Sequence, residues 1–141
     1  MGDRVLGFPA TLEGYQQALA DLQAALDEHG VRARGRYNVE LVFEEIVCNI
    51  IEHGRAGDSE RAIEVAIGFE AGAVVMSFYD SGPQFDPRRH PVPEAPDSLE
   101  AARVGGLGLV LVRQAATRME YERTPQNKNH LTVAVTAGEG Q

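Results

Sequence analysis

A glutamate and an asparagine four residues apart, Glu45 and Asn49, form the first pair whose types and spacing could do chemistry. On an α-helix, residues with this spacing lie one turn above the other on the same face. The Glu45 carboxylate could accept a proton or orient a nucleophile, and the Asn49 amide oxygen could bind a hard cation such as Mg²⁺. The same pair also suits the solvated face of a helix, so its meaning depends on the rest of the chain.

A second candidate site begins at Asp80, in the run Asp80-Ser81-Gly82-Pro83. An aspartate at the end of a strand, buried beside a ligand, could accept a hydrogen bond from an exocyclic amine. Gly82 would let the backbone turn and approach a planar ring closely. The same residues also suit a simple polar turn that leads from a strand into a loop.

The third candidate is a glycine-rich run before an apolar helix, Gly105-Gly106-Leu107-Gly108. Backbone N–H groups at the start of a helix are a natural seat for phosphate. The run lacks the Lys-Ser/Thr ending of a Walker A loop and the spacing of a dinucleotide-binding fingerprint. A flexible hinge at the end of a loop is the alternative interpretation.

Helical periodicity places the first pair on a helix that we expect to run from near Tyr37 to Gly54. Its apolar stripe comprises Val39, Val42, Phe43, Ile46, Val47 and Ile50. An earlier short strand over 5–8 precedes a helix with Thr11 as its N-cap and Gly30 at its end. These helices would carry one apolar face each, which must pack against a sheet.

Alternating apolar residues predict a hairpin over 63–80 and a second one over 119–135, with a helix after the glycines. The intervening segment 83–104 is polar and rich in proline, and its length is typical of a lid. The predicted fold is α+β: a two-layer α/β sandwich with a largely antiparallel sheet and helices on one face. We expect residues 1–141 to form a single domain.

Composition narrows the class of function. The net charge of -8 and the absence of a basic stripe argue against direct nucleic-acid binding. A single cysteine excludes an internal disulfide, and the sequence has no cysteine-containing metal motif. It also has no apolar run of membrane-spanning length and no signal-peptide profile at its start. These absences predict a cytoplasmic protein that has no membrane association.

The order of the motifs is more specific than any one of them. Glu-x-x-x-Asn on a helix, Asp-x-Gly after a strand, Gly-Gly-Leu-Gly before a helix and a late threonine in a strand follow in turn. This order resembles the GHKL ATPase superfamily, whose ATP site lies in a Bergerat fold. The closest resemblance is to RsbW-like anti-sigma-factor serine/threonine kinases, through Phe8-Pro9-Ala10-Thr11, the 49–54 segment and Asn129-His130-Leu131-Thr132. It covers about residues 8–135.

The resemblance implies a role for each motif residue toward ATP and Mg²⁺. Glu45 would be the general base that activates the acceptor hydroxyl, and Asn49 would hold the Mg²⁺ that bridges the phosphates. Asp80 would bind the adenine amine, Gly82 would shape that pocket, and Thr132 would complete the adenine contacts through Asp80 or a water. The phosphates would be cradled under the lid by Gly105, Gly106, Leu107 and Gly108.

The sequence departs from some relatives directly before the glycine run. They carry an arginine there, whereas this chain has Val104, with Arg103 one residue away. Arg88 and Arg89 in the lid could substitute for that charge. His53 would either border the nucleotide or act at the helix C-terminus, where the dipole favours it.

The family resemblance implies an ATP-dependent protein serine/threonine kinase and anti-sigma factor. It would phosphorylate a STAS-type anti-anti-sigma partner and sequester a sigma factor, in most cases as a homodimer. A rival hypothesis is a nucleotide-gated module that holds a partner and transfers no phosphate. A detached histidine-kinase catalytic domain is a third interpretation, disfavoured because the chain has no room for a phospho-accepting helix pair.

Overall fold

The computed structural model describes residues 4–53, 62–70, 72–89 and 107–137. Its strands are β1 (Arg4–Pro9), β2 (Ala62–Glu70), β3 (Ala73–Asp80), β4 (Ala116–Arg123) and β5 (Asn129–Thr136). Its helices are α1 (Leu12–Glu28), α2 (Ala33–His53), α4 (Leu107–Ala115) and the short 3₁₀ helix η1 (Pro87–Arg89). Within these residues, no helix combines the length and the apolar character needed to cross a bilayer.

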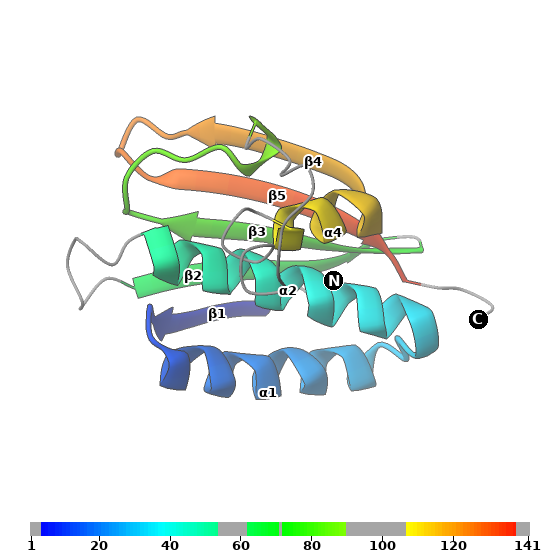
Figure 1. The fold of residues 1–141 in the computed structure, drawn as a ribbon. Helices are drawn as coiled ribbons and strands as arrows, with labels where there is room; N and C mark the ends of the chain where they lie inside the picture. Colours follow the sequence, from blue (N-terminus) through cyan, green and yellow to red (C-terminus); the bar gives the residue numbers. More distant parts are fainter. Residues whose placement is uncertain (1–3, 54–61, 71, 90–106, 138–141) are drawn as a thin grey trace.

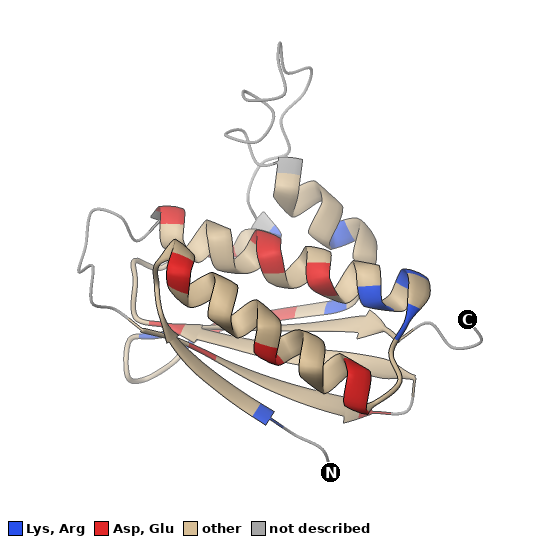
Figure 2. Cartoon of the chain, turned by 90° about the horizontal axis from the view of Figure 1, so that it is seen from below, with Lys and Arg blue, Asp and Glu red and all other residues tan. Residues whose placement is uncertain are grey.

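The five strands form one sheet in the order β1-β2-β3-β5-β4, and every neighbouring pair is antiparallel. Helices α1, α2 and α4 lie together on one face of this sheet (Figures 1 and 2). The predicted α+β two-layer sandwich is therefore confirmed. Both predicted hairpins are present, and β5 rather than β4 joins the second hairpin to β3.

Helix α1 begins as its sequence predicts. The Thr11 side chain accepts a hydrogen bond from the backbone N–H of Gly14 at 3.0 Å, which satisfies one of the donors that a helix start leaves open. Helix α2 begins earlier than expected, at Ala33 instead of near Tyr37. The added turn lies before the apolar stripe, and its Arg36 forms an ion pair at 2.9 Å with Glu40 in the next turn, an interaction that hydrophobic periodicity does not detect.

The core between the layers fixes how α2 lies on the sheet. Phe43 of α2 packs between Phe8 of β1 and Phe78 of β3, with ring centroids 6.3 and 6.2 Å away. Val39, Ile46 and other residues of the same stripe are also buried. Each such side chain contributes about 1.5–3 kcal/mol on burial. This packing fixes the orientation of α2 on the sheet, and with it the positions of Glu45 and Asn49.

Alternation along the strands decides which side chains face the helices. On β3, the alternating buried side chains belong to Val74, Met76, Phe78 and Asp80; on β5, they belong to Asn129, Leu131, Val133 and Val135, and Ala134 is buried as well. Directly opposite residues in antiparallel strands share a face. The register pairs Asp80 with Asn129, so two polar side chains end the buried rows of the two central strands.

Candidate functional site: a nucleotide pocket between α2 and the sheet

A pocket lies between the C-terminal half of α2 and the ends of the central strands, with about 420 Å³ of empty space that is partly open to solvent. Three elements contribute its walls: α2, the sheet, and the loop after β3. Its lining residues are Ile46, Asn49, Ile50, Phe78, Asp80, Pro83, Phe85, Pro87, Tyr121, Asn129 and Leu131. The walls are mostly apolar and carry a few polar groups, which is typical of a small-molecule site.

Asp80 places a buried carboxylate in this pocket, with 7% of the residue exposed. Its Oδ1 accepts a hydrogen bond from the Gly82 backbone N–H at 2.8 Å and another from the Asn129 side-chain amide at 3.2 Å. The first bond closes a local turn around the aspartate. The second joins β3 to β5. Asp80 and Gly82 therefore lie together, as the motif predicts, and the carboxylate is held in one orientation.

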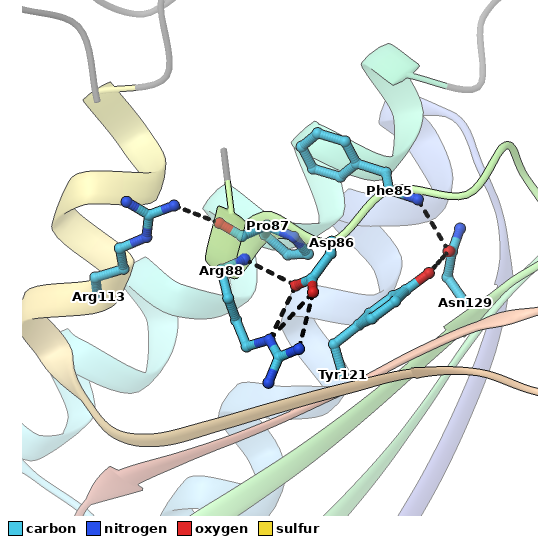
Figure 3. Close-up of polar contacts among 7 residues, drawn as sticks. All are labelled: Phe85, Asp86, Pro87, Arg88, Arg113, Tyr121 and Asn129. Carbon is cyan, nitrogen blue, oxygen red and sulfur yellow. Dashed lines mark hydrogen bonds and ion pairs between the residues drawn. The ribbon is translucent and has the colours of Figure 1, made fainter. Parts of the chain in front are cut away.

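Asn129 organises the polar end of the pocket, and it was not among the predicted site residues. Its Nδ2 donates to Asp80 Oδ1 and to the Pro83 carbonyl, at 3.2 and 2.9 Å. Its Oδ1 accepts from the Tyr121 hydroxyl, the Phe85 backbone N–H and Arg123. Figure 3 shows Phe85 and Tyr121 meeting at this oxygen. One side chain thus connects three strands and the loop after β3.

Thr132 does not lie at this pocket, contrary to the expectation that it completes the adenine contacts. Its hydroxyl lies within hydrogen-bonding distance of Ser77 Oγ (3.4 Å) and His130 Nε2 (3.2 Å). Thr132 pairs with Ser77 in the sheet, so both side chains face away from the helices. The inward position opposite Asp80 belongs to Asn129. In the sequence, the alternation of Leu131, Val133 and Val135 already indicated that odd-numbered residues of this strand, Asn129 included, face the core.

Glu45 and Gly108 meet where α4 begins to pack against α2. A Cβ atom built on Gly108 would lie 2.1 Å from Glu45 Oε1 and 2.9 Å from its Cδ. Only a residue without a side chain leaves the carboxylate in this position. The glycine run and the Glu-x-x-x-Asn helix, about 60 residues apart in sequence, are therefore neighbours at this point.

Several acidic side chains of α2 act electrostatically on Tyr15 of α1. Tyr15 of α1 stacks on Phe43 with ring centroids 5.9 Å apart. Burial raises the pKa of Tyr15 to about 12, and the charges of Glu44 and other α2 groups, Glu45 among them, add to the effect. The carboxylates of α2 therefore act on the neighbouring helix α1 as well. Among the described residues, no cluster of three or more His, Cys, Asp or Glu side chains could hold a metal by itself.

Several predicted residues lie outside the described part of the chain. Gly105 and Gly106 are among them, as are Arg103, Val104 and most of the expected lid. Leu107 is the first residue of α4, and the side chains of Leu107, His53 and Arg89 are not described. Arg88 pairs with Asp86 at the base of the expected lid, 2.8 Å between Nη2 and Oδ2. The structure thus brings Asn49 and Asp80 to one pocket and places Gly108 beside Glu45.

The family model for the histidine kinase-like ATPase domain matches residues 8–135, which is nearly the whole chain. The chain belongs to this family. A relative from Bordetella bronchiseptica named serine/threonine-protein kinase BtrW is 31% identical over 101 residues, which cover 72% of this chain and 70% of that protein. These matches confirm the resemblance to GHKL ATPases and to their serine/threonine-kinase branch.

Solved structures share the fold of this ATPase-domain family member. The RsbU and RsbW domains of Rv1364c from Mycobacterium tuberculosis match with a TM-score of 0.67 at 20% identity, over 95% of this chain. This chain spans only 32% of that longer protein. The SiaB–SiaC complex from Pseudomonas aeruginosa matches with a TM-score of 0.64 at 16% identity, over 94% of this chain and 88% of the matched one.

Proposed function

We propose that this ATPase-domain protein is an ATP- and Mg²⁺-dependent protein serine/threonine kinase. It acts as a single domain on a STAS-type anti-anti-sigma partner, sequesters a sigma factor, and works as a homodimer in the cytoplasm. The observation that carries the nucleotide site is the convergence of Asp80, Asn129 and Asn49 on one pocket, next to the contact between Glu45 and Gly108.

The two ends of the site have different roles, base recognition at one and phosphate binding and transfer at the other. At the inner end, the buried Asp80 carboxylate accepts a hydrogen bond from the adenine amine, while the apolar walls cover the ring. Gly82 shapes the turn that carries this wall. At the outer end, backbone N–H groups from Gly105, Gly106, Leu107 and Gly108 bind the phosphates at the start of α4. Glu45 takes the proton from the acceptor hydroxyl as its oxygen bonds to the γ-phosphorus and ADP leaves.

The residues present suit Mg²⁺. Asn49 lines the pocket and offers a neutral amide oxygen there. Mg²⁺ keeps several waters and usually takes one or two protein ligands together with substrate phosphates, so a single amide is sufficient. When bound, the ion would neutralise charge on the phosphates during transfer.

The names of the relatives support the choice of reaction and partner. The relative from Bordetella is named a serine/threonine-protein kinase, and two solved structures contain RsbW and the complex of SiaB with SiaC. A partner-switching role follows if this chain shares their biochemistry. The expected partners are proteins, because the described surface carries acidic groups along α1 and α2 (Figure 2) and the chain has a net charge of -8.

The decisive experiment is phosphoryl transfer by the Glu45→Gln variant. We expect transfer from ATP to STAS-domain proteins of the same organism to fall by about 100- to 10,000-fold, because the amide cannot accept the proton. ATP affinity, measured by titration calorimetry, should change little. The matched control is Glu44→Gln, an exposed neighbour with the same change of charge. Equal activity of Glu45→Gln and the wild type would remove Glu45 from the role of base.

A second function is favoured by one feature of the sequence. Val104 precedes the glycine run, where some relatives carry an arginine near the transferred phosphate, and transfer depends on positioned positive charge. A nucleotide-gated binding module would keep the pocket without that requirement. ATP binding by the wild type with no transfer to any of several STAS-domain proteins would favour this function over the kinase.

A further inference from the structure

Three arginines from three elements line an open groove beside η1, outside the nucleotide pocket. The groove has about 530 Å³ of empty space, and its described lining consists of Arg88, Arg113, Ala116, Thr117, Arg118 and Met119. None of these six residues is acidic, and none lines the nucleotide pocket. The chain as a whole has 21 acidic and 13 basic residues, so a concentration of positive charge is unusual on this protein.

The surrounding structure holds two of the three guanidinium groups in place. Arg113 reaches from α4 to the carbonyl of Pro87, at 2.6 Å from its Nη2 (Figure 3). Arg88 makes a two-pronged contact with Asp86, at 2.8 and 3.0 Å. Arg118 lies on the edge strand β4, its side chain 48% exposed and its Nε 3.9 Å from Glu120. Two arginines are therefore anchored, and the third can approach a ligand from the open side.

Asp86 pairs with Arg88 and Glu120 lies 3.9 Å from Arg118, so two negative charges offset part of the three positive ones and the groove keeps a net positive charge toward an anion. Guanidinium groups present planar pairs of N–H donors that match carboxylate and phosphate oxygens. A single carboxylate is satisfied by one such pair. A phosphate monoester carries nearly two charges and three terminal oxygens, so it can accept from more than one arginine at once.

We propose that this groove binds a phosphate monoester dianion, presented by a phosphorylated serine or threonine side chain of a protein. The groove opens at the edge strand β4, where an extended peptide can approach, and all three arginines contribute to its lining. The proposal does not rest on the proposed kinase function, because binding a phosphorylated side chain requires no phosphoryl transfer by this chain.

The groove and the nucleotide pocket are separate but adjacent. Pro87 lines the pocket, and its carbonyl is held by Arg113 of the groove. The next residue, Arg88, lines the groove. A phosphate in the groove is therefore expected to bind in the presence of a nucleotide in the pocket, a property that separates the two sites in an experiment.

The test is titration calorimetry of the full chain with the end-capped tripeptide glycyl-phosphoseryl-glycine at constant ionic strength. The comparison ligands are the unphosphorylated tripeptide and inorganic phosphate. We expect the phosphopeptide to bind, the serine peptide to show no binding, and saturating ADP to leave the affinity within about twofold. Arg118→Gln should weaken phosphopeptide binding by about tenfold through loss of a charge-assisted hydrogen bond. Arg88→Gln should also weaken it.

The matched control is Arg34→Gln, which removes the same charge from an exposed position on the first turn of α2, outside both cavities. Its phosphopeptide affinity should stay within about twofold of the wild type. The proposal is overturned if the wild type shows no phosphopeptide binding at millimolar concentration, if Arg34→Gln weakens binding as much as Arg118→Gln, or if ADP abolishes it. Inorganic phosphate binding as tightly as the peptide would overturn the assignment to a protein side chain.

Discussion

The two ends of the proposed nucleotide site, the pocket around Asp80 and the contact of Glu45 with Gly108 beside it, are built in opposite ways. At the inner end, Asp80 and Asn129 are buried and joined by hydrogen bonds to Tyr121, Arg123 and the loop after β3. At the outer end, Gly108 has no side chain and so leaves room for the Glu45 carboxylate. The inner end thus depends on a network of hydrogen bonds, and the outer end also requires space beside α4 for the carboxylate.

This difference has a physical reason. A buried polar group is costly unless its hydrogen bonds are made, so the residues that fix Asp80 also stabilise the fold. Around Glu45, the proposed phosphoryl transfer requires access for a phosphate and a hydroxyl, and the small residue Gly108 leaves space there. We therefore expect substitutions at the inner end to alter stability and base recognition, and substitutions at the outer end to alter transfer while the fold stays intact.

The largest effect is expected for Asn129→Ala. The substitution leaves the Tyr121 hydroxyl, the Phe85 N–H and the Asp80 carboxylate without their shared partner, which should lower the free energy of unfolding by about 3 kcal/mol. Urea unfolding measures this change. Gln126→Ala, an exposed substitution in the neighbouring turn, should change it by less than about 0.5 kcal/mol. Similar values for the two variants would show that the inner end is not held by this network.

The next effect is expected for Gly108→Ala. The new methyl group would meet Glu45 Oε1 at 2.1 Å and displace the carboxylate, so phosphoryl transfer should fall by about 100-fold. Stability should be kept or rise by up to about 1 kcal/mol, because alanine favours a helix more than glycine. Transfer rates and thermal unfolding are measured together. Gly7→Ala, where no atom lies within 4 Å of the added Cβ, should leave transfer unchanged. Unaltered transfer in Gly108→Ala would mean that the position of the carboxylate is not critical.

The smallest effect is expected for Asp80→Asn. ATP affinity should fall by about tenfold, since a hydrogen bond to a charged acceptor is replaced by one to a neutral amide. GTP affinity should change less, because GTP presents a carbonyl where ATP presents the amine. Both affinities are measured by competition with a fluorescent nucleotide. Thr132→Val is the control on the other face of the sheet, and it should leave both affinities as they are. A larger loss for Thr132→Val would return Thr132 to the nucleotide site.

The predictions that were confirmed came from regular residue spacing within single helices and strands. Helical spacing is enough to place Glu45 and Asn49 on one face, because four residues make about one turn. Strand alternation was enough to find both hairpins and the buried position of Asp80. Thr132 was placed wrongly because the family resemblance took precedence over the alternation of its own strand, which assigns it to the outer face.

Pairing between distant segments was decided by the tertiary structure alone. Periodicity states which face a residue occupies, but it does not state which strand lies beside it. The register that sets Asn129 opposite Asp80 depends on β5, rather than β4, joining β3. In the same way, Gly108 meets Glu45, and Arg113 reaches Pro87, because α4 packs on α2 above this sheet. The sequence thus determined the chemical groups and their local faces, and packing determined which groups meet, because contacts between distant segments form only when the buried faces come together.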